Sequence, residues 1–442
     1  KWTKKLKITD AKFRLSYGVT GNESIGDYES ILTYGIGGIY DGVAGVTAAR
    51  IGVNDLGWEE TAQTNVGLDL NFNNNRIVFT ADYYNKATSN LLAAYEIPKE
   101  WGFNTVRKNI GSIVNKGLEF SLSGDVIKKK FVTWNIGANI TLNKNKVTEI
   151  AGGIPYIFND TWWISQGKPL GDFYGYTSNG IFAYDQSNAF TNNWEQLTPV
   201  FQTDASGQMI KDGNGKYILQ NYLLGNAVYT GTVNQKKLAD GTPFRGGDVN
   251  WQESPEDVNG VITDKDRTVI GNAQPDFIGG FNTNLRYKSL SLFVSAYFSI
   301  GGDIYNFAKY NLVQGSMNGL STVPPVDFLN NFWVKQGDEV TYARPYSDRF
   351  QNARAVNSMY LEDASYVKIR TIRLTYALPA KWVSKVKLRG VSVYSYVNNA
   401  FTFTGYSGYD PEFSAYSALA LGMDVNRYPR KREFGMGLNV NF

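Results

Sequence analysis

Apolar and polar residues alternate with a period of two through much of the chain, and this pattern predicts β-strands with two unlike faces. In FVTWNIGANITLNKNKV, every even-numbered position from Val132 to Leu142 is apolar, whereas the odd-numbered positions between them hold Thr, Asn or Gly. The same alternation occurs in AKFRLSYGV, TNVGLDLNF, RIVFTADYYNK, GLEFSLSGDV, FIGGFNTNLRYKSLSLFVSAYFS, YVKIRTIRLTYAL, LRGVSVYSYVNNAF and EFGMGLNVNF. With DFYGYTSNGIFAY included, the sequence predicts about eleven strands of roughly ten residues, the length that a tilted membrane strand needs.

The connections between the predicted strands alternate in length. Short turns (NNN, IKKK, KS and LPAKWVSKV) alternate with long segments at 20–59, 88–116, 148–171, 185–276, 300–364 and 402–430. Short turns on one rim and long loops on the other are typical of outer-membrane barrels. We therefore predict an all-β, transmembrane antiparallel β-barrel with long extracellular loops. A parity change between Ile369 and Ile372 predicts a β-bulge near Arg370 or Thr371.

The composition narrows the functional classes. The chain has no Cys and no His, which removes disulfides, thiolate chemistry, the usual general base and the commonest zinc ligand. The adjacent Glu59 and Glu60 point to opposite faces of a strand, so they do not form a glycosidase pair. A net charge of +4 gives no electrostatic argument for nucleic acid. We predict neither an enzyme nor a nucleic-acid-binding protein.

Membrane helices are not predicted, because no stretch approaches the ~20 apolar residues that a span requires. The mean hydropathy of −0.31 is compatible with a barrel, in which only alternate residues face lipid. Aromatic residues make up 14% of the chain and often lie near strand ends. Interfacial aromatic belts would explain this position, although aromatics also favour strands in general. The predicted belt residues are Tyr17, Tyr83, Tyr84, Tyr287, Tyr297, Tyr376, Tyr394 and Tyr396.

The terminal strand places an aromatic at the last position of an alternating apolar series. This arrangement resembles the signal that barrel-assembly machinery reads in outer-membrane proteins generally. The residues concerned are Phe434, Met436, Leu438, Val440 and Phe442. The alternative is an ordinary edge strand at a chain end, although an exposed apolar edge favours aggregation unless a barrel closes over it.

Several stretches carry a family resemblance in addition to the alternation. LSYGVTGNESIGDY is similar to a segment of SusC/RagA-type TonB-dependent transporters, and further similar segments follow in the family's order from Leu15 to Phe442. They are LGWEETAQTNVGLDL with DYYNKATSNLL, NIGSIVNKGLEFSL, PLGDFYGYTSNGIF, DRTVIGNAQPDFIGGF, GGDIYNF, YLEDASYVKIRTIRLTYALPAKW, YSGYDPE and a late YP. Each piece alone is a weak signal, but the combination is specific to this family.

The resemblance implies a barrel of about 22 strands with an N-terminal plug in its lumen. It implies an outer-membrane protein of a Gram-negative bacterium that imports large nutrients, either oligosaccharides or peptides. The implied partners are a SusD-like surface lipoprotein that forms a lid, the TonB–ExbB–ExbD system that supplies energy, and outer-membrane lipid. The family is often dimeric, and no cofactor is required. Residues 1–442 are expected to be the C-terminal half, without the plug or the TonB-contacting segment, so the remaining N-terminal half must complete the barrel.

One acidic loop suggests a metal site. In EDVNGVITDKDRTVIG, Asp257, Asn259 and Asp266 resemble the ligand spacing of a calcium loop. The position of the first ligand falls on Pro255, which has no side-chain donor, and the terminal carboxylate is Asp rather than the longer Glu. A structural Ca²⁺ in the 257–266 loop is therefore one hypothesis, and an acidic turn that bonds its own backbone is the other.

Tryptophans in the predicted loops are the candidate ligand-binding residues. Trp101, Trp162, Trp163 and Trp333 can stack on sugar rings or pack against peptide side chains. The alternative is that large loops fold around their own aromatics. Two other functional classes stay open: a passive porin or surface adhesin that binds glycans, and a soluble β-sandwich that binds carbohydrate. The first would need no energised gate, and the second would need no detergent.

Overall fold

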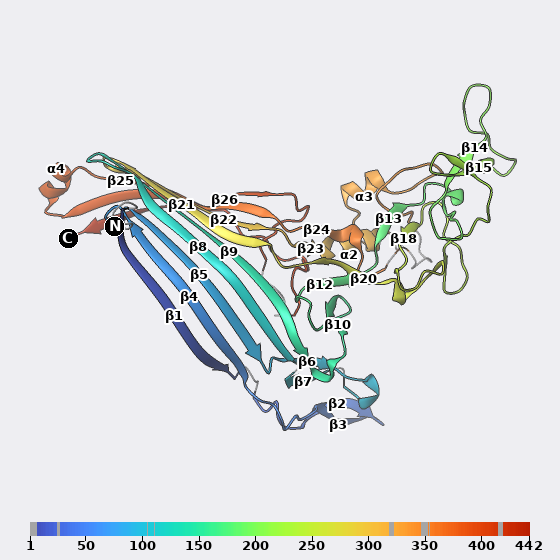
Figure 1. Ribbon diagram of the computed structural model, residues 1–442, viewed down its shortest axis with the longest axis horizontal. Helices are drawn as coiled ribbons and strands as arrows, with labels where there is room; N and C mark the ends of the chain where they lie inside the picture. Colours follow the sequence, from blue (N-terminus) through green and yellow to red (C-terminus); the bar gives the residue numbers. More distant parts are fainter. Residues whose placement is uncertain are drawn as a thin grey trace.

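Ten long strands form a single antiparallel sheet in the part of the chain that the computed structural model describes (Figure 1). The described residues are 7–23, 27–103, 105–109, 111–317, 322–345, 352, 354–413 and 419–442. The sheet order is β1-β4-β5-β8-β9-β21-β22-β25-β26-β27. These strands are β1 (Ile8–Asn22), β4 (Glu59–Phe72), β5 (Ile77–Ser89), β8 (Gly111–Lys128), β9 (Val132–Ile150), β21 (Phe277–Tyr287), β22 (Leu290–Ile300), β25 (Tyr366–Ala377), β26 (Gly390–Thr404) and β27 (Glu433–Asn441).

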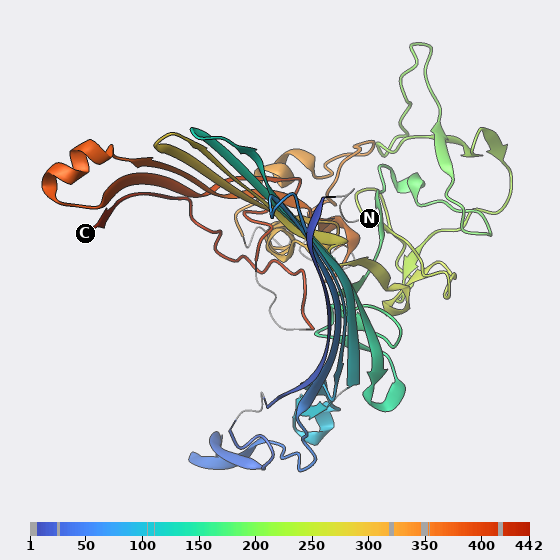
Figure 2. The ribbon, with the colours of Figure 1, turned by 60° about the vertical axis from the view of Figure 1, so that its left-hand side comes forward.

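The sheet is strongly curved, as an arc of a barrel wall is, and β1 and β27 are its two edges (Figure 2). The side chains at the apolar positions of its strands are exposed across the sheet. Leu15 is 69% exposed on β1, and Met436 is 84% exposed on β27. A contiguous apolar face of this kind requires a covering, which a bilayer provides. The predicted all-β transmembrane barrel wall is confirmed.

The strand count differs from the prediction in one place. The segment DFYGYTSNGIFAY was expected to be a barrel strand, but it forms β12 (Asp172–Gly175) and β13 (Ser178–Ile181) in two small sheets outside the wall. The reason is burial on both sides, because Phe173, Tyr176 and Phe182 are all buried in one apolar cluster. The chain therefore makes one excursion, 151–276, between β9 and β21 instead of two loops separated by a strand.

The turns and the bulge follow the predicted pattern. Asn73, Asn74 and Asn75 all have positive φ, of 51°, 57° and 63°, which fits the tolerance of Asn for left-handed backbone. Four short connections, 73–76, 129–131, 288–289 and 378–389, alternate with the long ones, and the last contains α4 (Ala380–Val383). The register between β25 and β26 shifts between Ile369 and Thr371, so the predicted bulge is confirmed.

The long connections lie at the opposite end of the strands from the short turns and fold into a layer of their own (Figure 1). We call residues 151–276, 301–317, 322–345, 354–365, 405–413 and 419–432 the loop layer. Its strands and α-helices, in addition to β12 and β13, are β10 (Tyr156–Phe158), β11 (Trp162–Ile164), β14 (Thr198–Phe201), β15 (Leu219–Leu224), β16 (Ala227–Tyr229), β17 (Lys237–Leu238), β18 (Val249–Trp251), β19 (Val261–Ile262), β20 (Thr268–Asn272), β23 (Asp303–Tyr305), β24 (Leu361–Asp363), α2 (Phe307–Met317) and α3 (Val326–Asn331).

The buried apolar core of the described chain belongs to this layer. Of the residues in the main buried cluster, only Val147 and Ile150 come from a strand of the ten-stranded sheet. Two hairpins, β2 (Thr33–Tyr40) with β3 (Val43–Arg50) and β6 (Leu92–Glu96) with β7 (Thr105–Asn109), extend the same rim. None of the helices in the described residues is long and apolar enough to span a bilayer. The loop layer is thus a folded structure and not a set of separate loops.

Candidate functional site

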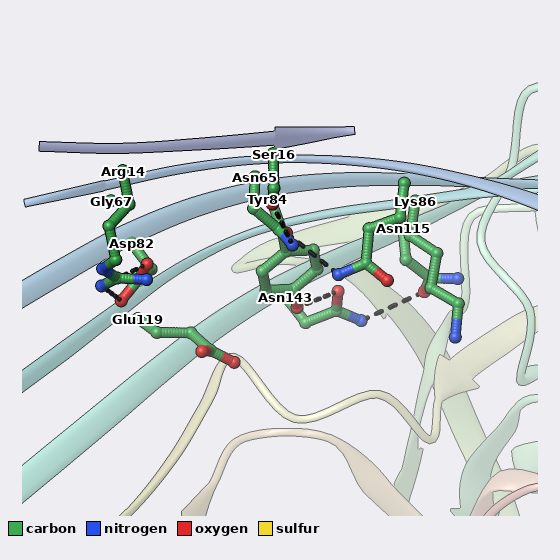
Figure 3. A pocket seen from close by; sticks show the side chains of 11 residues that line it. Arg14, Ser16, Asn65, Gly67, Asp82, Tyr84, Lys86, Asn115, Glu119 and Asn143 are labelled. Atoms are coloured by element: carbon green, nitrogen blue, oxygen red, sulfur yellow. Dashed lines mark hydrogen bonds and ion pairs between the residues drawn. The ribbon is translucent and has the colours of Figure 1, made fainter. Parts of the chain in front are cut away.

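The polar face of the sheet forms a recess of about 620 Å³ along β1, β4, β5, β8 and β9 (Figure 3). Every residue that lines it belongs to the polar set of alternating positions, which the sequence pattern predicts to face the barrel lumen. The lining residues are Arg14, Ser16, Gln63, Asn65, Gly67, Asp82, Tyr84, Lys86, Asn115, Glu119 and Asn143. The recess is a hydrated wall of amides, hydroxyls and a few charges, which suits the inner surface of a barrel.

One arginine joins three strands of this wall. Arg14 on β1 donates to Asp69 on β4 (Nε to Oδ2, 2.8 Å) and to Asp82 on β5 (Nη2 to Oδ2, 3.0 Å). The guanidinium lies across Gly67, where a Cβ would overlap both Arg14 and Asp82. Glycine at this position therefore permits the cross-strand bridge.

An amide ladder continues the wall toward the long-loop rim. The Tyr84 hydroxyl donates to Asn143 Oδ1 (2.8 Å), and the Asn143 and Asn145 side chains both donate to Asn115 Oδ1 (3.3 and 2.9 Å). The Tyr84 ring covers Gly117 on β8. This section of the wall offers neutral hydrogen-bonding groups to whatever lies inside the barrel.

The predicted aromatic belt is only half correct. Tyr17, Tyr83, Tyr287 and Tyr376 are exposed on the apolar face, as belt residues should be. Tyr84, Tyr297, Tyr394 and Tyr396 have the opposite parity and face the polar side. The rings of Tyr84, Tyr394 and Tyr396 lie over Gly117, Gly437 and Gly435 on neighbouring strands, and Tyr297 is the cross-strand partner of Gly280.

A buried ion cluster ties the loop layer to the wall. Lys368 on β25, with its side chain 1% exposed, contacts Asp410 (2.9 Å) and Glu412 (2.8 Å). Glu412 also pairs with Arg370, and the guanidinium of Arg370 lies 4.5 Å from the centre of the Tyr297 ring. Because Asp410 and Glu412 lie in the connection from β26 to β27, this cluster fixes that connection against the wall.

The loop layer holds further buried charges, each with a defined partner. Arg344 donates to Asp248, whose carboxylate also accepts from Asn352 (3.1 Å), and both charged side chains are buried. Lys236 donates to the Trp251 carbonyl (2.7 Å), and burial lowers the pKa of its ammonium. Burial and a hydrogen bond to Asp264 raise the pKa of Tyr176 to about 12. These contacts pair charged and polar groups in the interior of the loop layer with one another.

The structure separates the four candidate tryptophans. Trp162 and Trp333 are buried (2% and 8% exposed), and their indole N–H groups donate to the carbonyls of Leu421 and Ala183. Both indoles pack inside the loop layer, which supports the alternative that the loops fold around their own aromatics, and ligand contact by these two stays a prediction. Trp101 is 66% exposed, in the short helix η1 (Lys99–Trp101). Trp163 is partly exposed and stacks on Tyr174 with ring centres 4.8 Å apart, so Trp101 and Trp163 stay predictions as ligand contacts.

The acidic loop is held by carboxylates that bond its own backbone. Asp266 is 1% exposed and accepts from the backbone N–H groups of Ser254 (2.9 Å) and Thr263 (2.7 Å). The Asn259 amide donates to Asp257 (2.8 Å), and Glu253 accepts from the Asn259 backbone. No group of three Asp or Glu side chains that could hold a metal occurs in the described part of the chain. These bonds support the acidic-turn alternative, and the calcium site stays an untested prediction.

The terminal strand has the geometry that its pattern predicts. β27 pairs with β26 throughout, and Phe434, Met436, Leu438 and Phe442 are 75%, 84%, 59% and 83% exposed. Val440 shares their parity and is partly exposed. Their role in barrel assembly remains a prediction.

Sequence patterns did not identify the Arg14 bridge or the Lys368 cluster. Both depend on pairing between residues at least 42 positions apart, which a single sequence does not specify. A signal for the second did exist, because the motif YSGYDPE contains Asp410 and Glu412.

The comparisons with known proteins agree with this architecture. The family model described as TonB dependent receptor-like, beta-barrel matches residues 6–231. The chain belongs to the TonB-dependent receptor β-barrel family. Barrels of this family reside in the outer membrane of Gram-negative bacteria, which is the location we assign to this sheet. The expected SusC/RagA-type resemblance and localisation are confirmed.

Individual relatives extend the match over almost the whole chain. TonB-dependent receptor P39 of Formosa agariphila is 36% identical over 98% of this chain, and TonB-dependent receptor SusC of Bacteroides thetaiotaomicron is 27% identical over 98%. The solved RagAB peptide transporter shares the fold, with a TM-score of 0.72 at 24% identity over 98% of this chain. The matched part is 40%, 38% and 41% of the respective relative. The chain thus spans about two fifths of the length of these proteins.

Proposed function

We propose that this chain is the barrel part of an outer-membrane transporter that imports large nutrients, and that it performs no catalysis. The observation that carries the proposal is the pairing of a polar inner wall with a folded loop layer on one rim only. A barrel wall alone would serve a porin. A loop layer with its own core and buried ion clusters is what a receptor needs to present a fixed surface to a large ligand.

The polar wall supports passage of a hydrated cargo. Its inner face carries amides and hydroxyls at Asn65, Tyr84, Asn115 and Asn143, and the positive charge of Arg14 is paired with two carboxylates. Such groups exchange hydrogen bonds with sugars or peptide backbones equally well. The cargo is therefore an oligosaccharide or a peptide, and RagAB, which shares this fold, is a peptide transporter.

The remaining parts of the transporter come from outside this chain. Because β1 and β27 have unpaired edges within the described residues, further strands must complete the wall in lipid. We propose that an N-terminal half supplies these strands and a plug, that TonB–ExbB–ExbD supplies energy, and that a SusD-like lipoprotein covers the loop layer. A dimer of the whole complex fits the same scheme.

The experiment compares energised uptake with passive flow. Cells that carry the complete receptor are given a labelled tryptic peptide mixture or a labelled oligosaccharide mixture, each too large for general porins, with ExbB present or deleted. We expect accumulation of one mixture only, and only with ExbB present. Accumulation that persists without ExbB, together with steady conductance of the purified receptor in planar bilayers, would instead establish a porin. Binding of either mixture without accumulation would establish an adhesin.

A further inference from the structure

The apolar stripe on β8 and β9 ends in lysines before the strands end. Leu118 pairs with Leu142, the next pair on the same face is Lys116 with Lys144, and the next is Val114 with Lys146. We call Lys116, Lys144 and Lys146 the lysine trio. All three are exposed, and they lie at the long-loop end of the strands, beyond the apolar band. The outward face therefore changes from apolar to cationic between one cross-strand pair and the next.

Among the described residues, no acidic side chain forms an ion pair with a lysine of the trio. Lys116 and Lys144 are direct cross-strand partners, and like charges in that position destabilise a strand pair. The outward neighbours Asn85 on β5 and Thr148 on β9 are uncharged. The nearby Glu149 accepts a hydrogen bond from Ser112. An anion supplied from outside the protein would relieve this repulsion.

The trio borders a defined groove. A recess of about 640 Å³ is lined by the three lysines together with Tyr83, Leu118 and Leu142. Its wall is the segment 167–169, which extends the sheet beyond β9. There the Val147 N–H donates to the Lys168 carbonyl (2.9 Å), and the Gly167 N–H donates to the Val147 carbonyl (2.8 Å). The groove is thus built on hydrogen-bonded backbone, with an apolar half and a cationic half.

We propose that this groove binds a phosphorylated glycolipid of the outer leaflet. Its acyl chain lies along Leu118 and Leu142, and its phosphate lies among the lysine trio. A lipid is favoured over a soluble anion because the apolar floor is continuous with the stripe that faces the bilayer. The outer leaflet follows from the position at the long-loop rim, which is extracellular in such barrels. The inference rests on the membrane placement of the barrel and is independent of import.

The test measures lipid retention by the complete receptor after purification in detergent. Native mass spectrometry follows binding of added lipid A that carries its phosphates, for the wild type and for a triple variant with Lys116→Gln, Lys144→Gln and Lys146→Gln. The matched control is Lys129→Gln, Lys381→Gln and Lys385→Gln, three exposed lysines near the short turns. Heat-modifiable migration on gels verifies that each receptor is folded.

We expect the triple variant to bind lipid A about 100-fold more weakly, because each lysine near a membrane surface contributes roughly fivefold in affinity. The control variant should bind as the wild type does, and dephosphorylated lipid A should bind the wild type as weakly as lipid A binds the triple variant. Equal binding by the triple variant, or equal binding of dephosphorylated lipid, would overturn the proposal. Complete displacement by inorganic phosphate alone would reduce the groove to a simple anion site and would also overturn it.

Discussion

The ring of Tyr394 on β26 lies across Gly437 on the terminal strand, and the two residues are direct cross-strand partners. A Cβ at position 437 would overlap the ring atoms. The neighbouring pair, Tyr396 with Gly435, repeats the arrangement, and the two tyrosine rings stack with centres 6.3 Å apart. The glycines that alternate with the apolar residues in EFGMGLNVNF therefore have a packing role on the polar side.

Gly437→Val should impair folding of the terminal hairpin, because overpacking costs about 1–3 kcal/mol and the neighbour is a ring that is itself stacked. The measurement is the folded fraction of the complete receptor in outer membranes, read from heat-modifiable migration. Gly405→Val is the control, since its Cβ would meet open space. Adding Tyr394→Ala to Gly437→Val should restore folding; if it does not, the valine acts through something other than this contact.

Lys368→Met should destabilise the connection between β26 and β27. It leaves Asp410 and Glu412 without the buried ammonium that both contact, and breaking a buried pair costs about 3–5 kcal/mol. Limited proteolysis within 405–432 measures the effect. The control is Lys431→Met, whose side chain is 78% exposed and pairs with Glu433, an exposed type of pair worth about 0–1 kcal/mol. Equal protease resistance of both variants would contradict the structural role of Lys368.

The strand wall could be predicted from the sequence because lipid imposes a strict rule on each strand. Alternate residues must be apolar wherever the wall crosses the bilayer, so Val132 to Leu142 reveals both the strand and its orientation. Turn chemistry such as Asn73–Asn75 then fixes the hairpins. The rule no longer applies beyond the bilayer. β9 is 19 residues long, and its last part, up to Ile150, has lysines at positions where the earlier part has apolar residues.

The loop layer could not be predicted in the same way because the residues of its buried core follow no regular spacing in the sequence. Trp162 and Trp333 come from segments far apart, and each is buried by contacts with other loops. DFYGYTSNGIFAY resembled a wall strand because it has aromatics at alternate positions, a pattern that fits both a barrel wall and a buried loop core. Residue type alone therefore marked the loop tryptophans as candidate ligand contacts. Only the fold shows which of their indoles are buried and which are exposed.

Asp266→Asn should loosen the 253–266 loop. The carboxylate is buried and accepts two backbone N–H groups, and an unsatisfied buried donor costs about 1–3 kcal/mol. Thermal unfolding and protease sensitivity of the loop measure the change, with Asp240→Asn in an exposed turn as the control. The same assays in Ca²⁺ and in EGTA test the metal hypothesis. Lower stability of the wild type in EGTA supports the calcium site, whereas equal stability in both leaves backbone capping as the explanation.

Trp101→Ala and Trp162→Ala should have opposite consequences. Removal of the buried indole at 162 leaves a cavity among Phe158 and Phe173, so the loop layer should lose about 3–5 kcal/mol of stability. Trp101 is exposed, so its removal should leave the melting temperature unchanged and lower cargo binding. Calorimetry gives the first quantity, and binding of the imported mixture to the complete receptor gives the second. If Trp101→Ala binds cargo as the wild type does, the exposed indole serves another contact, and Trp163 remains the candidate.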